Sequence, residues 1–102
     1  MSRPKHRIQL LRVAEDDFTE IVSYIAADRP SAADALAGKI EKNLRLLSSS
    51  PHLGRVPKEE ELAHLHYRYL VVENYLVFYT IEGHTIYVHR ILHGARDYLS
   101  LF

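Results

Sequence analysis

The C-terminal third of the sequence gathers the side chains best suited to chemistry, namely Arg68, Arg90, His93, Arg96 and Tyr98. Cleavage of RNA without a metal needs a base for the 2′-hydroxyl, an acid for the leaving 5′-oxygen and positive charge at the phosphorane. His, Tyr and Arg can supply these three roles. The same side-chain types also dominate the energetics of protein–protein contacts. The residue types therefore leave both catalysis and binding open, and Arg96 and Asp97 could equally form a local polar pair.

The seven histidines raise the question of a metal site. His64 and His66 lie two residues apart, so on a strand they would share a face, and His89 and His93 could lie near them. However, the chain has no cysteine and no HExxH spacing, and the acidic residues near these histidines form no recognised ligand pattern. We therefore predict no metal site and no cofactor, with the histidines at the surface and at sheet edges.

Other familiar catalytic arrangements are also missing from the sequence. No serine stands in a G-x-S-x-G turn, which is the context of the serine nucleophile in α/β-hydrolases. Without cysteine there is neither a thiol nucleophile nor a disulfide. The four glycines are scattered and form no phosphate-binding loop. Any catalysis would have to come from Arg, His and Tyr side chains.

The length and composition predict one globular domain over residues 1–102. Hydrophobic residues make up 47% of the chain and charged residues 25%, which is the ordinary globular proportion. The longest apolar run is too short for a membrane span, and the N-terminus lacks the apolar core of a secretory signal. We expect a cytoplasmic protein with no membrane partner. Its net charge of zero favours no nucleic-acid partner.

The N-terminal half predicts a strand followed by two helices. Residues 6–13 have the composition of a short strand, and from Ala14 the apolar spacing becomes helical, with Glu15, Asp16 and Asp17 in the first turn. The sequence "DRPS" at 28–31 ends this helix, and Ser31 is the predicted N-cap of the second. The expected apolar stripes are Phe18, Ile21, Val22 and Ile25 in the first helix and Ala33, Leu36, Ala37, Ile40, Leu44 and Leu47 in the second.

The C-terminal half predicts three strands after a loop at 48–57. The runs 65–73, 75–81 and 85–92 are rich in β-branched and aromatic residues, and the turns at 73–74 and 82–84 join them into an antiparallel meander. The acidic stretch 58–61 is expected in a loop. The predicted fold is α+β in the order β-α-α-β-β-β, with the helical hairpin packed on one face of a small sheet.

These strands are apolar on both faces, although one helical hairpin covers only one of them. In the third run, His89 and Ile91 are expected on one face and Arg90 and Leu92 on the other. The uncovered face would keep a tyrosine-rich, partly apolar surface, which on a monomer usually marks a partner site. A curled sheet with half-buried tyrosine rings is the alternative.

The order of elements, the loop "PHLGR", the strand "YLVFYTI" and the closing run "VHRILHGARDYLSLF" resemble the RelE/ParE superfamily of type II toxin–antitoxin toxins. The resemblance extends from about Arg7 to Leu101, and "HRILHGARD" is most similar to the ParE-like branch. It implies a small toxin, of the kind involved in plasmid stabilisation and growth arrest. A cognate antitoxin would neutralise it by wrapping a C-terminal segment around it, and DNA would be contacted only through the antitoxin.

The predicted antitoxin-binding residues are Leu10, Tyr24, Tyr67, Tyr69 and Tyr79. Tyr24 is expected on the exposed surface of the first helix, and the other tyrosines are expected on the strands of the sheet. Disordered segments that fold on binding bury large areas of this kind.

Members of the superfamily have one of two activities, and the resemblance to the superfamily is compatible with either. RelE-like members are ribosome-dependent endoribonucleases that cut mRNA, whereas ParE-like members inhibit DNA gyrase without nuclease chemistry. In RelE-like enzymes the second meander strand usually begins with an aromatic–Arg pair whose Arg contacts the scissile phosphate. Here the matching pair is Tyr75-Leu76. Losing such a charge contact costs on the order of 3 kcal/mol of transition-state stabilisation.

The leading hypothesis is therefore a ParE-like toxin that binds gyrase through the target-binding residues Arg90, Arg96, Asp97 and Tyr98. The alternative is a ribosome-dependent mRNA interferase that uses Arg68, His93, Arg96 and Tyr98 on ribosome-bound mRNA. A third hypothesis is a non-toxic binding or regulatory protein on the same fold. The sequence leans away from an enzyme, because Leu76 lacks the phosphate-binding charge and the chain is neutral overall.

Overall fold

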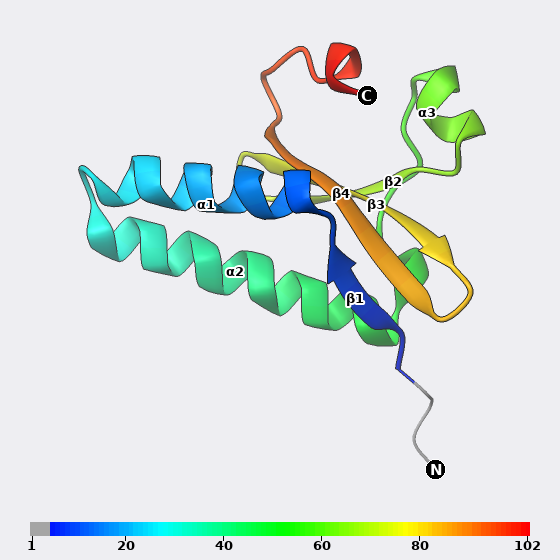
Figure 1. The fold of residues 1–102 in the computed structure, drawn as a ribbon, viewed down its shortest axis with the longest axis horizontal. Coiled ribbons are helices and arrows are strands. Elements are labelled where there is room, and N and C mark those ends of the chain that lie inside the picture. The colour runs from blue at the N-terminus through cyan, green and yellow to red at the C-terminus, as the bar shows by residue number, and fades with distance from the viewer. Residues whose placement is uncertain (1–4) are drawn as a thin grey trace.

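A computed structural model describes residues 5–102 (Figure 1). The elements in chain order are β1 (Arg7–Leu10), α1 (Arg12–Ala26), α2 (Pro30–Ser49), the 3₁₀ turn η1 (Pro51–Leu53), α3 (Glu60–His64), β2 (Arg68–Val72), β3 (Tyr75–Glu82), β4 (Thr85–His93) and the 3₁₀ turn η2 (Leu99–Leu101). The predicted α+β order is confirmed, with the short helix α3 added. No helix of the described residues is long and apolar enough to cross a membrane.

The four strands form one sheet in the order β1-β4-β3-β2. β2, β3 and β4 pair antiparallel, as the two short turns between them predict. β1 joins the sheet parallel to β4, with Ile8 opposite Ile86. The core of the fold is therefore a meander whose last strand, β4, lies inside the sheet between β3 and β1.

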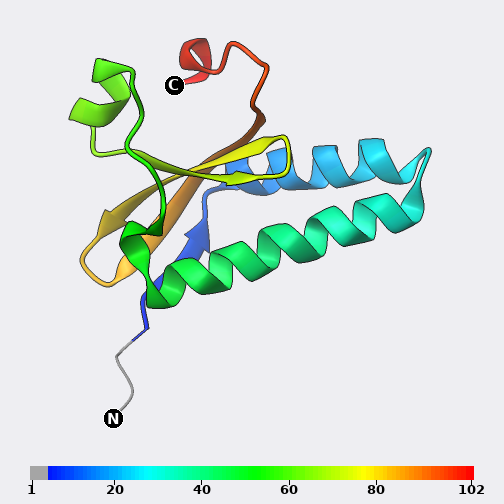
Figure 2. The ribbon, with the colours of Figure 1, turned by 180° about the vertical axis from the view of Figure 1, so that it is seen from behind.

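The helices α1 and α2 form an antiparallel hairpin that packs on one face of the sheet and extends beyond it (Figures 1 and 2). Most residues of the predicted apolar stripes belong to or pack against the core under the sheet, because residues three and four apart share one side of a helix. The main cluster of buried residues comprises Ala14, Leu36, Ile40, Leu47, Leu70, Val72, Val77, Tyr79, Ile86, Val88 and Ile91. We call this side of the sheet the helix face.

The opposite side, which we call the far face, is covered by α3 and the C-terminal segment 94–102. Leu62 of α3 is buried against Phe78 and Leu92, and Tyr98 and Leu101 pack around them. The ring of Phe102 contacts the rings of Tyr67 and Phe78 at centroid distances of 4.9 and 5.0 Å. The prediction of an uncovered tyrosine-rich face is therefore wrong, because the chain's own C-terminus packs on it.

A β-bulge in β4 changes the faces that its residues occupy. Phe78 of β3 lies opposite Arg90, but the next residue, Tyr79, lies opposite Val88, so His89 is an extra residue without a partner. His89 contacts Tyr67 on the far face, whereas Ile91 belongs to the core of the helix face. The prediction that His89 and Ile91 share a face is wrong, because strict alternation fails at a bulge.

Several predicted boundaries also differ from the structure. α1 begins at Arg12, so the opening strand 6–13 is shorter than predicted. α2 begins at Pro30 with Arg29 as its N-cap and no side-chain cap, because proline fits the first helical position. α2 continues to Ser49, so the predicted loop starts later. The last two residues of the acidic stretch, Glu60 and Glu61, begin α3, and the predicted strand 65–73 begins only at Arg68.

Candidate functional site

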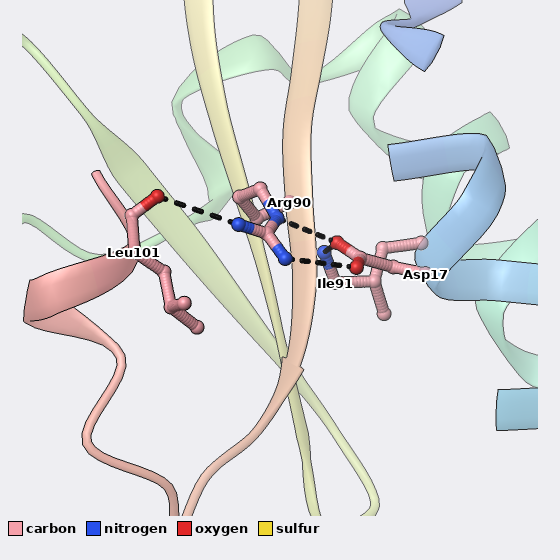
Figure 3. Close-up of polar contacts among 4 residues, drawn as sticks. All are labelled: Asp17, Arg90, Ile91 and Leu101. Atoms are coloured by element: carbon pink, nitrogen blue, oxygen red, sulfur yellow. Dashed lines mark hydrogen bonds and ion pairs between the residues drawn. The ribbon is translucent and has the colours of Figure 1, made fainter. Parts of the chain in front are cut away.

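The C-terminal part of β4 is joined to α1 by a two-pronged ion pair (Figure 3). Nε of Arg90 donates to Oδ2 of Asp17 at 2.8 Å, and Nη2 donates to Oδ1 at 3.0 Å. The backbone N–H of Ile91 also donates to Oδ2 of Asp17, at 3.0 Å. Both side chains are largely buried, with 17% of Arg90 and 12% of Asp17 exposed. The hydrogen bonds to Asp17 raise the pKa of Arg90, so its guanidinium stays charged.

Arg90 reaches the C-terminal segment as well. Its Nη1 donates to the carbonyl oxygen of Leu101 at 3.3 Å, so one guanidinium connects α1, β4 and the turn η2 (Figure 3). Each of the three guanidinium nitrogens of Arg90 therefore donates a hydrogen bond within the chain. We predicted Arg90 as a target-binding residue, but its contacts make it a residue that positions the C-terminal segment.

Beside this ion pair lies a cavity of about 210 Å³ between α1 and the paired ends of β3 and β4. Three of its lining residues are aliphatic, namely Ile21, Ile91 and Leu92. The remaining lining residues are polar or aromatic: Asp17, Glu20, Tyr24, Tyr75, His93 and Arg96. The His93 ring packs edge-on against Tyr75 at a centroid distance of 5.3 Å. The cavity therefore suits a ligand side chain that is mainly apolar and that also carries a polar group to meet the polar lining residues.

The two candidate catalytic residues in this cavity, His93 and Arg96, lie close together. The backbone N–H of Arg96 donates to the carbonyl oxygen of His93 at 3.1 Å. Nδ1 of His93 accepts a hydrogen bond from the backbone N–H of Ala95 at 3.1 Å, which leaves Nε2 as the ring nitrogen for a ligand. Both side chains are exposed, as is Asp97. They are accessible to a partner or a substrate.

Tyr98 faces away from that cavity and packs on the far face. Its ring lies 5.1 Å from that of Phe78, and its hydroxyl donates to Oε1 of Glu59. This hydrogen bond, together with burial and the negative charge of Glu59, raises the pKa of Tyr98 to about 12. At neutral pH such a phenol stays protonated, so it is a poor base.

Arg68, the fourth candidate catalytic residue, lies at the start of β2. Its Nη1 donates to the carbonyl oxygen of Gly54 at 2.9 Å, and it lines a different hollow from the one that holds His93 and Arg96. The four predicted catalytic residues therefore occupy three places. The structure brings only His93 and Arg96 together.

The residues predicted to contact an antitoxin differ in accessibility. Tyr24 is 82% exposed, so its ring is available on the outer surface of α1. Leu10 is half-buried and packs against the main core. Tyr67 and Tyr69 are half-buried on the far face, and burial raises the pKa of Tyr67. These four keep a surface on which a partner could pack.

Tyr79 has a structural role, which corrects its assignment as an antitoxin contact. Its side chain is fully buried in the core of the helix face. Its hydroxyl accepts from the N–H of Gly54 at 2.9 Å and donates to the carbonyl oxygen of Pro51 at 2.8 Å. A Cβ at position 54 would lie only 2.5 Å from that hydroxyl, so glycine is required there. Tyr79 therefore anchors the loop after α2.

Sequence reasoning missed Asp17 and Glu59 as partners of the C-terminal residues. Asp17 was assigned to the helix dipole, but it pairs with Arg90, which is 73 residues away. Glu59 was assigned to a loop, but it binds Tyr98, which is 39 residues away. The sequence offered one signal: three carboxylates, Glu15, Asp16 and Asp17, follow one another at the start of the first helix, more than the helix dipole alone explains. Among residues 5–102, no group of three or more potential metal ligands is assembled.

A family model for the ParE toxin of the type II toxin–antitoxin system parDE matches residues 8–98. The chain belongs to this family of ParE toxins. The match confirms the resemblance that the sequence indicated, and it includes β4 and the segment up to Tyr98. Among curated protein sequences, none matches the chain.

Solved structures of ParE-like and RelE-like toxins share the fold. A chain of the chromosomal ParDE system of P. aeruginosa aligns with a TM-score of 0.72 and 18% identity, covering 89% of this chain and 98% of its own. The Mycobacterium tuberculosis RelBE2 toxin–antitoxin complex gives 0.61 and 17%, covering 87% and 98%. The YoeB/ParE toxin of Agrobacterium tumefaciens gives 0.60 and 14%, covering 85% and 96%. At these identities the structures establish the fold alone.

Proposed function

We propose that this ParE-family toxin is neutralised by a cognate antitoxin and acts by binding and inhibiting DNA gyrase, without cleaving RNA. The observation that carries the proposal is the separation of Arg68, the His93–Arg96 pair and Tyr98 into three places. A metal-free nuclease needs its base, acid and phosphate-binding charge around one phosphate. Four residues distributed in this way fit contacts to a protein better than they fit one reacting centre.

Two further features support binding over cleavage. Leu76, which stands where the RelE resemblance expects a phosphate-binding Arg, packs in the apolar cluster of the far face. The chain also has a net charge of zero, whereas affinity for RNA depends on neutralising phosphates with basic residues. The exposed residues Arg96 and Asp97 would then contact the target, and Arg90 and Tyr98 would hold the segment that carries them.

The antitoxin assignment is supported by the family and by the fold of the RelBE2 and ParDE chains. Tyr24 is the most accessible of the predicted antitoxin contacts. It also lines the cavity that contains His93 and Arg96. A segment bound over Tyr24 would therefore lie against the proposed target-binding residues and would neutralise the toxin by covering them.

Expression of the chain in a bacterial host without an antitoxin tests the proposal. We expect growth arrest without cleavage of mRNA, as read by mapping the 5′-ends of transcripts. Arg96→Gln should weaken the arrest, and Arg45→Gln, an exposed arginine on α2, is the matched control. Cuts at a fixed position within codons would instead establish the ribosome-dependent interferase. Absence of growth arrest would favour a non-toxic binding protein.

The interferase remains the second candidate because His93 and Arg96 share one cavity. A histidine beside an arginine can supply an acid or base and a positive charge. In that case His93→Ala should abolish cleavage, whereas under the gyrase proposal there is no cleavage to abolish.

A further inference from the structure

Two adjoining hollows lie where the loop after α2 meets the connection between α3 and β2. The first, of about 320 Å³, is lined by His52, Val56, His66, Tyr67 and Arg68, among others. The second, of about 370 Å³, shares His66, Tyr67 and Ile81 with the first and adds Leu65 and Thr80. Neither hollow includes His93 or Arg96, so they are separate from the cavity beside α1.

The first hollow contains a fixed positive charge. Arg68 is half-buried, and one of its five N–H groups donates to the carbonyl oxygen of Gly54. That carbonyl is held in place because the N–H of Gly54 donates to the buried hydroxyl of Tyr79. The remaining guanidinium donors make no other hydrogen bond within the described residues. Arg68 is thus positioned in advance for an anionic group.

The rest of the lining also favours an anion. Among the described residues around the first hollow, none is acidic, and His52, His66 and the hydroxyl of Tyr67 add polar groups. A carboxylate that entered here would meet the Arg68 guanidinium, which matches its planar geometry. Glu82 lines only the second hollow.

Large apolar side chains stand exposed beside the charge. Val56, at the first hollow, is 56% exposed and Leu65, at the second, is 60% exposed. Apolar contacts next to a charge suit a peptide, which can present a carboxylate and an aliphatic side chain together. They suit a polynucleotide less well, because a chain with a net charge of zero offers little excess positive charge to neutralise a phosphate backbone.

His66 occupies a backbone position at which glycine would be more stable. After α3, the N–H of Tyr67 donates to the carbonyl oxygen of Leu62, and the N–H of His66 donates to that of Ala63. This is the Schellman arrangement, whose left-handed residue is usually glycine. His66 takes that conformation with φ of 66°. A strained residue whose side chain lines a hollow is a candidate for a functional role.

We propose that these two hollows bind an acidic peptide segment of a partner protein, with a carboxylate on Arg68 and a neighbouring aliphatic side chain against Leu65 and Ile81. His66 would line the junction between the two subsites. This role would explain why a histidine stands at a position where glycine would be more stable. The inference holds whichever molecule the toxin inhibits, because it rests on the lining residues alone.

Titration of the isotopically labelled full chain with acetyl-Glu-Ala-Leu-amide, followed by amide chemical shifts, tests this site. We expect shifts confined to residues around His66 and Arg68 and about tenfold weaker binding by Arg68→Gln, the factor expected for loss of a charge-assisted hydrogen bond. Arg45→Gln, an exposed arginine on α2, is the matched control and should bind like the native chain. The neutral peptide acetyl-Gln-Ala-Leu-amide should bind about as weakly as Arg68→Gln binds the acidic one.

A second variant separates binding from folding. His66→Gly should raise the melting temperature by about 3 °C, since it relieves the left-handed strain, and should still weaken binding of the acidic peptide. Equal binding of the acidic and neutral peptides, or an unchanged affinity in both variants, would overturn the proposal. So would a hexanucleotide that shifts the same amides at lower concentration than the peptide, since that result would make the site a phosphate site.

Discussion

The two faces of the sheet are built differently. Eleven buried residues form the core of the helix face, whereas three form that of the far face. The helix face is covered by two long helices, but the far face is covered by the one-and-a-half-turn helix α3 and by the segment 94–102. Side-chain hydrogen bonds to distant residues hold both coverings: Asp17 of α1 pairs with Arg90. The smaller covering depends on such bonds from Arg90 to Leu101 and from Tyr98 to Glu59.

The main hydrophobic core and the proposed binding residues therefore lie on different faces of the sheet. The helix face contributes most of the buried apolar area, which dominates folding free energy. The far face and its covering segment carry the exposed Arg96 and Asp97 and the hollows around Arg68 and His66. The proposed target-binding residues and the proposed peptide site thus lie on short segments that a few polar contacts hold in place.

The largest expected effect on the free energy of unfolding comes from replacing a buried leucine by alanine, and the loss should differ between the two faces. Leu47→Ala on the helix face should lower the free energy of unfolding by about 4 kcal/mol, and Leu62→Ala on the far face by about 2 kcal/mol. Both leucines are buried, with 0% and 1% exposed. The smaller cluster around Leu62 can close over the lost atoms more easily. Urea denaturation measures both values, and equal losses would contradict the comparison.

Removal of the charge of Asp17 tests the contact between α1, β4 and the C-terminal segment. Asp17→Asn should cost about 3 kcal/mol, since it leaves the buried Arg90 without its counter-charge. Asp16→Asn is the control, because Asp16 forms only an exposed pair with Arg12. Such pairs contribute about 0.5 kcal/mol or less. Similar losses in the two variants would show that Arg90 is not held by Asp17.

The contact between Tyr98 and Glu59 has a smaller expected value. Tyr98→Phe should lower the free energy of unfolding by about 1 kcal/mol, which is the typical net contribution of one hydrogen bond. Tyr24→Phe is the matched control and should be neutral, because Tyr24 is 82% exposed. A neutral Tyr98→Phe would indicate that Glu59 does not hold the C-terminal segment.

Tyr98 also predicts a pH dependence at the alkaline end. Its folded-state pKa of about 12 is higher than the unfolded value of about 10, so the protonated phenol is the form that stabilises the fold. This contribution is fully present below about pH 10 and is lost as the pH rises towards 12. The difference in stability between the native chain and Tyr98→Phe should therefore shrink over that range. An absorbance titration in which no tyrosine titrates late would contradict this prediction.

The sequence predicts the helix face well but not the far face. The stripe from Ala33 to Leu47 has a period that only a buried helix face explains, and the strands follow from their composition. The far face depends on the bulge at His89 and on pairs such as Asp17–Arg90, and no local pattern encodes these contacts between distant residues. For the same reason the sequence identified the C-terminal Arg, His and Tyr residues but not their separation into three places.

The most direct test of the proposed function is a supercoiling assay with purified DNA gyrase and the full-length chain. We predict that the toxin inhibits supercoiling at micromolar concentration, that Arg96→Gln weakens this inhibition and that Arg45→Gln does not. Full gyrase activity at micromolar toxin, together with growth arrest in cells, would contradict the account.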